Sequence, residues 1–202
     1  MALSRPALLL PDGPARQALA AALLDSALAA LVRGSIQGLV VLDPAPEMPA
    51  CAFEVVGHLP TAGGSHPVLY RALEEDPGRI AWVPPLLRDW VAASVRRLGL
   101  GRDIAAPPPP ARASGAVIAA ATDRAAGRVT LRPLLAAGDA GQVAAANVAL
   151  FRAQGFAEIH AVLDLGQPGQ AAFAEGLVQA GLAPAALIPD AAGDLLLLAA
   201  RA

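Results

Sequence analysis

The sequence predicts a folded protein of the α/β class. Short apolar runs of strand length alternate along the chain with longer segments whose apolar residues recur every three or four positions, as they do in helices. Groups of Gly, Pro and Asp separate these segments and predict turns. The length of 202 residues suits one large domain or two small ones.

The composition excludes several classes of protein. With 15 basic and 17 acidic residues and no basic cluster, the chain is not expected to bind nucleic acid, since phosphate neutralisation needs several Lys or Arg on one face. Its 55% hydrophobic and 16% charged residues argue against disorder. Cys51 is the only cysteine, which excludes an intramolecular disulfide and a Cys-based zinc site.

Neither a membrane span nor a signal peptide is expected. The most apolar stretch, residues 17–32, contains Asp25 and is shorter than the ~20 residues that a bilayer span needs. Near the N-terminus, Pro11 ends an apolar run before it reaches the length of a signal-peptide core. We therefore expect a cytoplasmic protein with no membrane partner.

The first third of the chain predicts one helix among strands. These elements are a strand at residues 7–10, a helix at 15–33, a strand at 38–42 and a hairpin with strands at 53–56 and 68–70. Leu19, Leu23 and Leu28 belong to the apolar stripe of the helix, which we expect to be buried. The strand at 38–42 is apolar throughout, which is typical of strands buried on both faces.

The middle of the chain predicts a strand at residues 80–83, an amphipathic helix and a connector. Pro84 and Pro85 favour the start of the helix, because proline is accepted in a first turn. The residues expected on its inward face are Leu86, Leu87, Trp90, Val91, Val95 and Leu98. Residues 105–113 contain four consecutive prolines and predict an extended linker.

The last third predicts a regular alternation of strands and helices. The expected strands lie at residues 116–121, 129–135, 159–165, 185–188 and 195–198, and the helices at 138–154 and 170–180. Asp139 is placed to cap the first of these helices.

Two parts of the chain can be aligned as an internal repeat. Gly34 stands nine residues before Asp43, Gly155 stands nine before Asp164, and both glycines follow a predicted helix. The turn segments 59–64 and 188–193, each before an apolar strand, also correspond. A unit of strand, helix, strand, helix and hairpin, with the second helix variable in length, therefore occurs twice.

This order resembles the C-terminal half of the GNAT (acyl-CoA N-acyltransferase) superfamily. In that family a strand is followed by a helix whose N-terminus binds acyl-CoA pyrophosphate, a strand splayed from the first, a helix and a hairpin. Gly155-Phe156 before a strand and residues 179–184 before the hairpin are similar to its sequences. The resemblance implies a mixed sheet with helices on both faces. It divides the chain into a half-unit at residues 1–73 and a reduced unit at 74–202.

The resemblance also implies a site for acetyl-CoA or another acyl-CoA, without a metal. The family's phosphate loop has Arg or Gln, two residues, Gly, one residue, and Gly or Ala, and Ala136, Asp139 and Gly141 occupy those places here. The carboxylate departs from the pattern and would repel pyrophosphate. The residues that would form the site are Gly138, Asp139, Ala140, Gly141 and Gln142. A capped structural helix is the other interpretation.

The candidate catalytic groups are few. His160, with Glu158 beside it, is the best candidate for the base that amine acylation needs, and a hydrogen-bonded histidine at a strand end is the alternative. His58 and His66 flank the first hairpin turn without an evident third metal ligand. Tyr70 is expected to pack rather than to protonate a thiolate.

Two hypotheses of function follow, and a third stays open. One is an acyltransferase that uses acyl-CoA at residues 138–142 to acylate an amine. The other is a non-catalytic GNAT-like module for protein association or ligand sensing, with a homodimer formed through a sheet edge or a hairpin such as 195–198. A small-molecule sensor with an unrelated α/β fold remains if the repeat is accidental.

Overall fold

The computed structural model describes residues 13–32, 38–42, 53–61, 64–190 and 192–200. The predicted strand at 7–10, Cys51 and the pair Gly34 and Asp43 lie outside the described residues. Within them, no helix combines the length and the hydropathy that a membrane crossing needs.

Helices and strands occur in the predicted order, with one strand added. They are α1 (Pro14–Leu31), β1 (Gly38–Val41), β2 (Glu54–Thr61), β3 (Gly64–Ala72), β4 (Arg79–Trp82), the 3-10 helix η2 (Pro85–Leu87), α2 (Arg88–Arg97), β5 (Arg102–Ala105), β6 (Val117–Asp123), β7 (Arg128–Leu135), α3 (Ala140–Ala153), β8 (Glu158–Asp164), the 3-10 helix η3 (Gln170–Phe173), α4 (Ala174–Gln179), β9 (Leu182–Ile188) and β10 (Leu195–Ala200). The added strand is β5, which ends at Ala105, where the predicted proline-rich connector begins.

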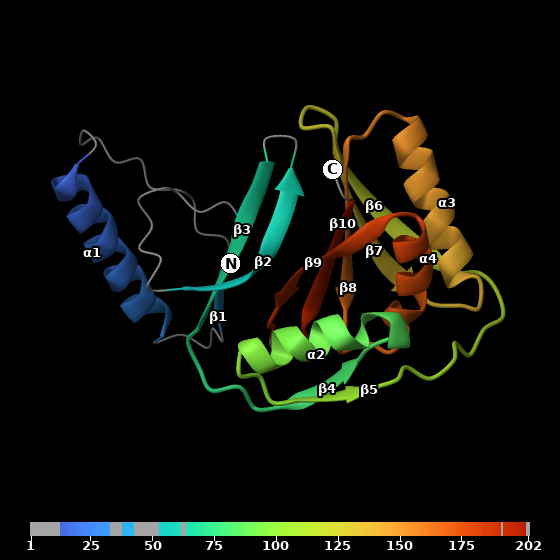
Figure 1. Ribbon diagram of the computed structural model, residues 1–202, viewed down its shortest axis with the longest axis horizontal. Helices are drawn as coiled ribbons and strands as arrows, with labels where there is room; N and C mark the ends of the chain where they lie inside the picture. Colours follow the sequence, from blue (N-terminus) through green and yellow to red (C-terminus); the bar gives the residue numbers. More distant parts are fainter. Residues whose placement is uncertain (1–12, 33–37, 43–52, 62–63, 191, 201–202) are drawn as a thin grey trace.

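Eight strands form one mixed sheet, which confirms the α/β class (Figure 1). Its order is β1-β3-β2-β9-β10-β8-β7-β6, with β7 and β8 parallel and the other neighbours antiparallel. Strands β4 and β5 make a separate parallel pair. The strand predicted at residues 38–42, buried on both faces, is found as β1. Among the described strands β1 pairs only with β3, and its residues pack in two different hydrophobic clusters, Leu39 and Val41 in one and Val40 in the other.

The sheet has two parts joined at one close contact. Strands β1, β3 and β2 form the first part and β9, β10, β8, β7 and β6 the second, and only Gly57 and Ala186 pair between them. A Cβ atom at Gly57 would overlap the carbonyl oxygen of Ala185. Glycine at position 57 is therefore what allows β2 and β9 to approach.

Successive residues of β8 lie on opposite faces of the second part of the sheet. Ile159, Ala161 and Leu163 belong to the main core, which α3 and α4 cover, whereas Val162 packs with residues of β2, β3, β9 and β10. His160 lies on the same side as Val162 and hydrogen-bonds the backbone of Pro60 in β2. Opposite α3 and α4, this face is thus covered by the β2–β3 hairpin, where the GNAT resemblance implied a helix.

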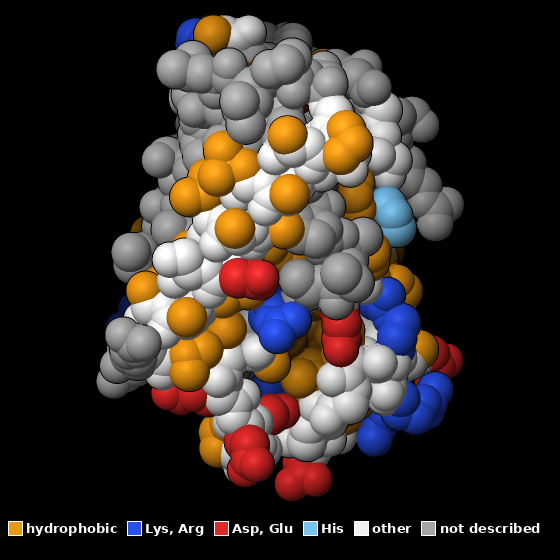
Figure 2. All heavy atoms as spheres, turned by 90° about the vertical axis from the view of Figure 1, so that its left-hand side faces the viewer, with side chains coloured by type: hydrophobic (Ala, Val, Ile, Leu, Met, Phe, Trp, Pro, Cys, Tyr) orange, Lys and Arg blue, Asp and Glu red, His pale blue; other side chains and the backbone are white. Residues whose placement is uncertain are grey.

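Helix α1 packs on β1 and β3 through its C-terminal half only. Leu28 and Leu31 are buried, but Leu19 and Leu23 are 39% and 43% exposed, against the prediction. Alanine and leucine surround this helix on all sides, so its sequence does not define one inner face. Figure 2, in which this end of the molecule faces the viewer, shows apolar side chains spread over the surface.

Helix α2 confirms most of its predicted inner face. Leu87, Val91 and Val95 are buried in the main core, while Leu86 is exposed. Leu86 and Leu87 both lie in η2, where three residues make a turn, and there Leu87 is buried and Leu86 is not. The α-helical spacing that places the other residues starts at Arg88.

Candidate functional site

The loop before α3, where the resemblance implies a phosphate site, is covered by the chain itself. The N–H of Gly138 donates to the carbonyl oxygen of Arg112 at 2.8 Å. A Cβ atom at Gly138 would lie 2.7 Å from the carbonyl oxygen of Ala113. This glycine therefore permits close approach of backbone, as its residue type suggested, but the neighbour is the segment that precedes β6.

Asp139 does not cap α3 with its side chain, which corrects the predicted role. Its carboxylate oxygens accept hydrogen bonds from the N–H groups of Gly115 and Ala116, both at 3.0 Å. The hydrogen bond from Gly115, followed by that from Ala116, lowers the pKa of Asp139. A negative charge therefore stands at the start of α3, where a pyrophosphate would need positive potential.

The next residues of the loop serve the packing of α3 on α4. Ala140 is buried in the main core, and Gln142 is exposed. A Cβ atom at Gly176 of α4 would overlap the carbonyl oxygen of Gly141. The first turn of α3 thus lies directly against the backbone of α4.

Strands β7 and β8 splay apart beyond their first four residues. They pair from Arg128 with Glu158 to Leu131 with Ala161. Farther on, β7 pairs only with β6 and β8 only with β10. The helical segment η3 contacts both strands at the opening, so the splay is present but closed from one side.

Two contacts fix η3 in the splay. The side-chain Oε1 of Gln170 accepts a hydrogen bond from the N–H of Asp164 at 2.8 Å. A Cβ atom at Gly169 would lie 3.0 Å from the Cβ of Ala136, just after β7. The backbone N–H of Asp164 is therefore already hydrogen-bonded to a side chain of this protein.

His160 and Glu158 are brought together on one face of β8, both largely buried. His160 is 5% exposed, and burial lowers its pKa, against the weaker opposite effect of its hydrogen bond to the carbonyl of Pro60. Glu158 is 8% exposed and forms an ion pair with Arg128, with Oε2 2.6 Å from Nε. His160 thus contacts β2 and Glu158 contacts β7, and their catalytic role stays a prediction.

The two remaining histidines lie on neighbouring strands of the hairpin. His58 pairs in register with Pro67, and His66 pairs with Leu59. Among the described residues, no group of three or more His, Cys, Asp or Glu side chains is arranged to hold a metal ion.

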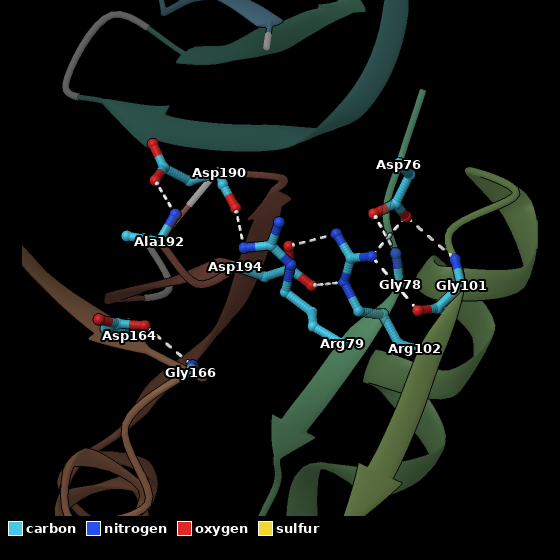
Figure 3. A network of polar contacts seen from close by, with 10 residues as sticks. All are labelled: Asp76, Gly78, Arg79, Gly101, Arg102, Asp164, Gly166, Asp190, Ala192 and Asp194. Atoms are coloured by element: carbon cyan, nitrogen blue, oxygen red, sulfur yellow. Dashed lines mark hydrogen bonds and ion pairs between the residues drawn. The ribbon is translucent and has the colours of Figure 1, made fainter. Parts of the chain in front are cut away.

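The most extensive polar cluster is one that the sequence did not reveal (Figure 3). Arg102 of β5 lies between Asp76 and Asp194, and its side chain is 2% exposed. Its Nε and Nη2 donate to the two carboxylate oxygens of Asp194 at 2.6 and 2.9 Å. Burial alone would lower the pKa of Arg102, and its bonds to Asp194 and Asp76 together outweigh that effect and raise it.

Asp76 and Arg79 extend this cluster to the neighbouring backbone. Asp76 accepts hydrogen bonds from the N–H groups of Gly101 at 3.0 Å and Gly78 at 3.2 Å, and it also bonds Arg102. Burial alone would raise the pKa of Asp76, and its bonds with Arg102 and with the two backbone groups lower it. Arg79 donates to the carbonyl oxygen of Asp190 at 2.7 Å.

The cluster is a clamp that joins the β4–β5 pair to the turn between β9 and β10. Arg102 and Asp194 are 92 positions apart, so no local spacing could have paired them. The only sequence signal was that Arg79 and Asp194 each follow a glycine and directly precede a predicted strand. Arg102 is paired with two carboxylates, and the N–H groups of Gly78 and Gly101 are hydrogen-bonded to one of them. An arrangement whose polar groups are bound to one another suits structural support.

Comparisons with protein-family models, with curated proteins and with solved structures found no match to this chain. The resemblance to GNAT proteins is therefore carried by this chain's own residues and strand order, and it stays a proposal.

Proposed function

We propose that this chain is a GNAT-like protein that serves as a non-catalytic association module and does not use acyl-CoA. The order β6, β7, α3, β8, α4, β9 and β10, with β7 parallel to β8 and splayed from it, supports the family assignment. The antiparallel β9–β10 hairpin beside β8 is the closing hairpin that the resemblance implies.

The pairing of the first strands supports one and a half copies of the GNAT unit. Strands β1, β3 and β2 follow the order of β8, β10 and β9, with antiparallel neighbours in both sets. Helix α1 precedes β1 as α3 precedes β8. The two sets meet through β2 and β9, which are the equivalent strands of each set.

The observation that carries the non-catalytic proposal is the backbone seated on the start of α3. Arg112 and Ala113 cover Gly138, and Asp139 binds the N–H groups of Gly115 and Ala116. These residues do not fit a pyrophosphate, because a carboxylate and a chain segment occupy the place of the anion. The placement of η3 in the splay points the same way.

Catalysis by His160 or Glu158 would need contacts within the chain to be broken. Both side chains are more than nine-tenths buried, and His160 is hydrogen-bonded to Pro60. An amine substrate would have to displace the carbonyl of Pro60 from His160, or Arg128 from Glu158. The acyltransferase hypothesis is therefore the less favoured one.

Calorimetric titration of the full chain with acetyl-CoA and with free CoA tests this proposal. We expect no heat of binding up to millimolar ligand at two temperatures. The exposed Gln142 offers a control, because Gln142→Glu adds a second negative charge to the same turn without a buried contact. Micromolar binding by the wild-type chain that is lost in this variant, with thermal unfolding unchanged, would contradict the proposal.

A further inference from the structure

Strand β6 ends the described part of the sheet and pairs on one side only. Its register runs with β7, from Val117 opposite Leu135 to Asp123 opposite Arg128, and no other described strand pairs with it. Residues 117–122 contain no charge, proline or glycine, and most of them are exposed. The features that usually keep strands from pairing with other chains are confined to its two ends, a register shift between Val117 and Ile118 and the charge of Asp123, so the segment between them is open to pairing.

We propose that β6 pairs antiparallel with β6 of a second copy, about a two-fold axis at Ala121. This homodimer names the partner of the proposed association module and so rests on that function. Antiparallel pairing of identical strands is isologous, so every contact made by one copy is repeated by the other.

A ladder of charges across the sheet supports this partner and this register. Glu158 pairs in register with Arg128, which pairs in register with Asp123 on β6. Arg128 is bound to Glu158 at 2.6 Å, so negative, positive and negative charges alternate up to the open edge. A positive charge on the same face of the sheet, beyond this edge, is therefore favoured.

The second copy supplies that charge in the proposed register. With the axis at Ala121, Ala119 of the partner lies opposite Asp123, and within the partner Ala119 pairs in register with the exposed Arg132. Residues directly opposite each other share a face, so the partner's Arg132 lies on the same face as Asp123 but two strands away, and the only side chain between them in that row is the methyl group of Ala119. The symmetry places the same row of charges on the other side of the axis.

The central residues of the strand are small enough for this approach. Ala120 and Ala121 are exposed, and Ala121 meets its own copy at the axis. A lysine at position 121 would place two like charges opposite each other there.

Light scattering or sedimentation over micromolar to millimolar concentrations tests the dimer. We expect a dimer whose dissociation constant rises about tenfold or more in Ala121→Lys, because the like charges face each other. The control Ala125→Lys makes the same change in the exposed β6–β7 turn, and we expect it to leave association unchanged. A wild-type chain that stays monomeric, or a dimer that Ala121→Lys does not weaken, overturns the proposal.

A double-mutant cycle tests the register. Arg132→Ala and Asp123→Asn should each weaken the dimer, and the double variant should weaken it no more than one change alone, because both changes remove the same pair. Effects that simply add, with all variants folded, overturn the assigned register. The outcome is independent of CoA titration: a monomer that binds no CoA rejects only the dimer, and a dimer that binds acetyl-CoA at the α3 loop rejects only the proposed function.

Discussion

The two parts of the sheet have the same strand pairing but differ in how well their helices close the core. In the second part, α3 and α4 cover strands whose inward residues, including Leu131, Ile159 and Leu163, are fully buried. In the first part, the cluster between α1 and the sheet has five buried members among the described residues, two of them on α1 itself, and none is fully excluded from solvent. The second part therefore contains most of the hydrophobic stabilisation.

The first part is held on the second by contacts other than those of α1. Val56 and Val68 pack with Ala186 and Leu197 in a cluster that crosses the boundary. Arg97 of α2 donates to the carbonyl oxygen of Val55 at 2.7 Å. Two sets of strands with a similar order can thus differ in their cores. One set has a fully buried core of its own beneath its helices, and the other relies on contacts with its neighbour.

The largest expected effect comes from truncating the core of the second part. Phe173→Ala removes a fully buried ring and should lower the free energy of unfolding by about 3–5 kcal/mol, measured by urea denaturation. Leu69→Ala in the first part should cost less, about 2 kcal/mol, and Leu19→Ala should stay within about 0.5 kcal/mol. If Leu69→Ala lowered the free energy of unfolding by more than Phe173→Ala, the second part would not have the more stabilising core.

The clamp at Arg102 should rank next. Arg102→Met leaves the carboxylate of Asp194 buried and without its main partner, so we expect a loss of about 3 kcal/mol in thermal or urea unfolding. The double variant with Asp194→Leu is the matched control. It should recover part of the loss, because no charge then remains buried. Equal stability of the two variants would argue against an ion-pair clamp.

The contact between the two parts should respond to Gly57→Ala. The added methyl overlaps the backbone of β9, and overpacking of this kind costs about 1–3 kcal/mol. Hydrogen exchange should show faster exchange in β2 and β3, with β7 and β8 unchanged, because only the docking of the hairpin is disturbed. The control Ser65→Ala, at an exposed position of β3, should change neither. Uniformly faster exchange would mean that the two parts unfold as one unit.

The smallest expected effect is a pH dependence that comes from His160. Burial lowers its pKa in the folded chain below the ordinary value of 6.5, so below about that pH the unfolded chain binds a proton that the folded chain does not. This contribution to stability is present above pH 6.5 and is lost as the pH falls toward the folded-state pKa. His160→Gln keeps a donor for Pro60 and should remove this slope in thermal unfolding between neutral and mildly acidic pH. A slope that survives in the variant must come from another group.

The candidate sites show where prediction from the sequence stopped. Gly138, Asp139 and Gly141 were correctly placed at the start of a helix after a strand, because turn residues and apolar periodicity are local signals. That Arg112 and Ala113 would lie on this loop was not predictable, because the proline-rich segment before β6 has no pattern that directs it. The same holds for His160, whose neighbour Pro60 is 100 positions away in the chain.

The sequence by itself determined the class, the order of the elements and most of their bounds. These follow from the spacing of apolar residues and from turn chemistry, which act within a few residues. Only the tertiary structure decided that β1 pairs with β3, that Leu19 and Leu23 stay exposed, and that Arg102 pairs with Asp194. The physical reason is that burial and pairing depend on which surfaces meet. In a chain where alanine and leucine occupy every side of a helix, many surfaces are equally apolar, and packing selects among them.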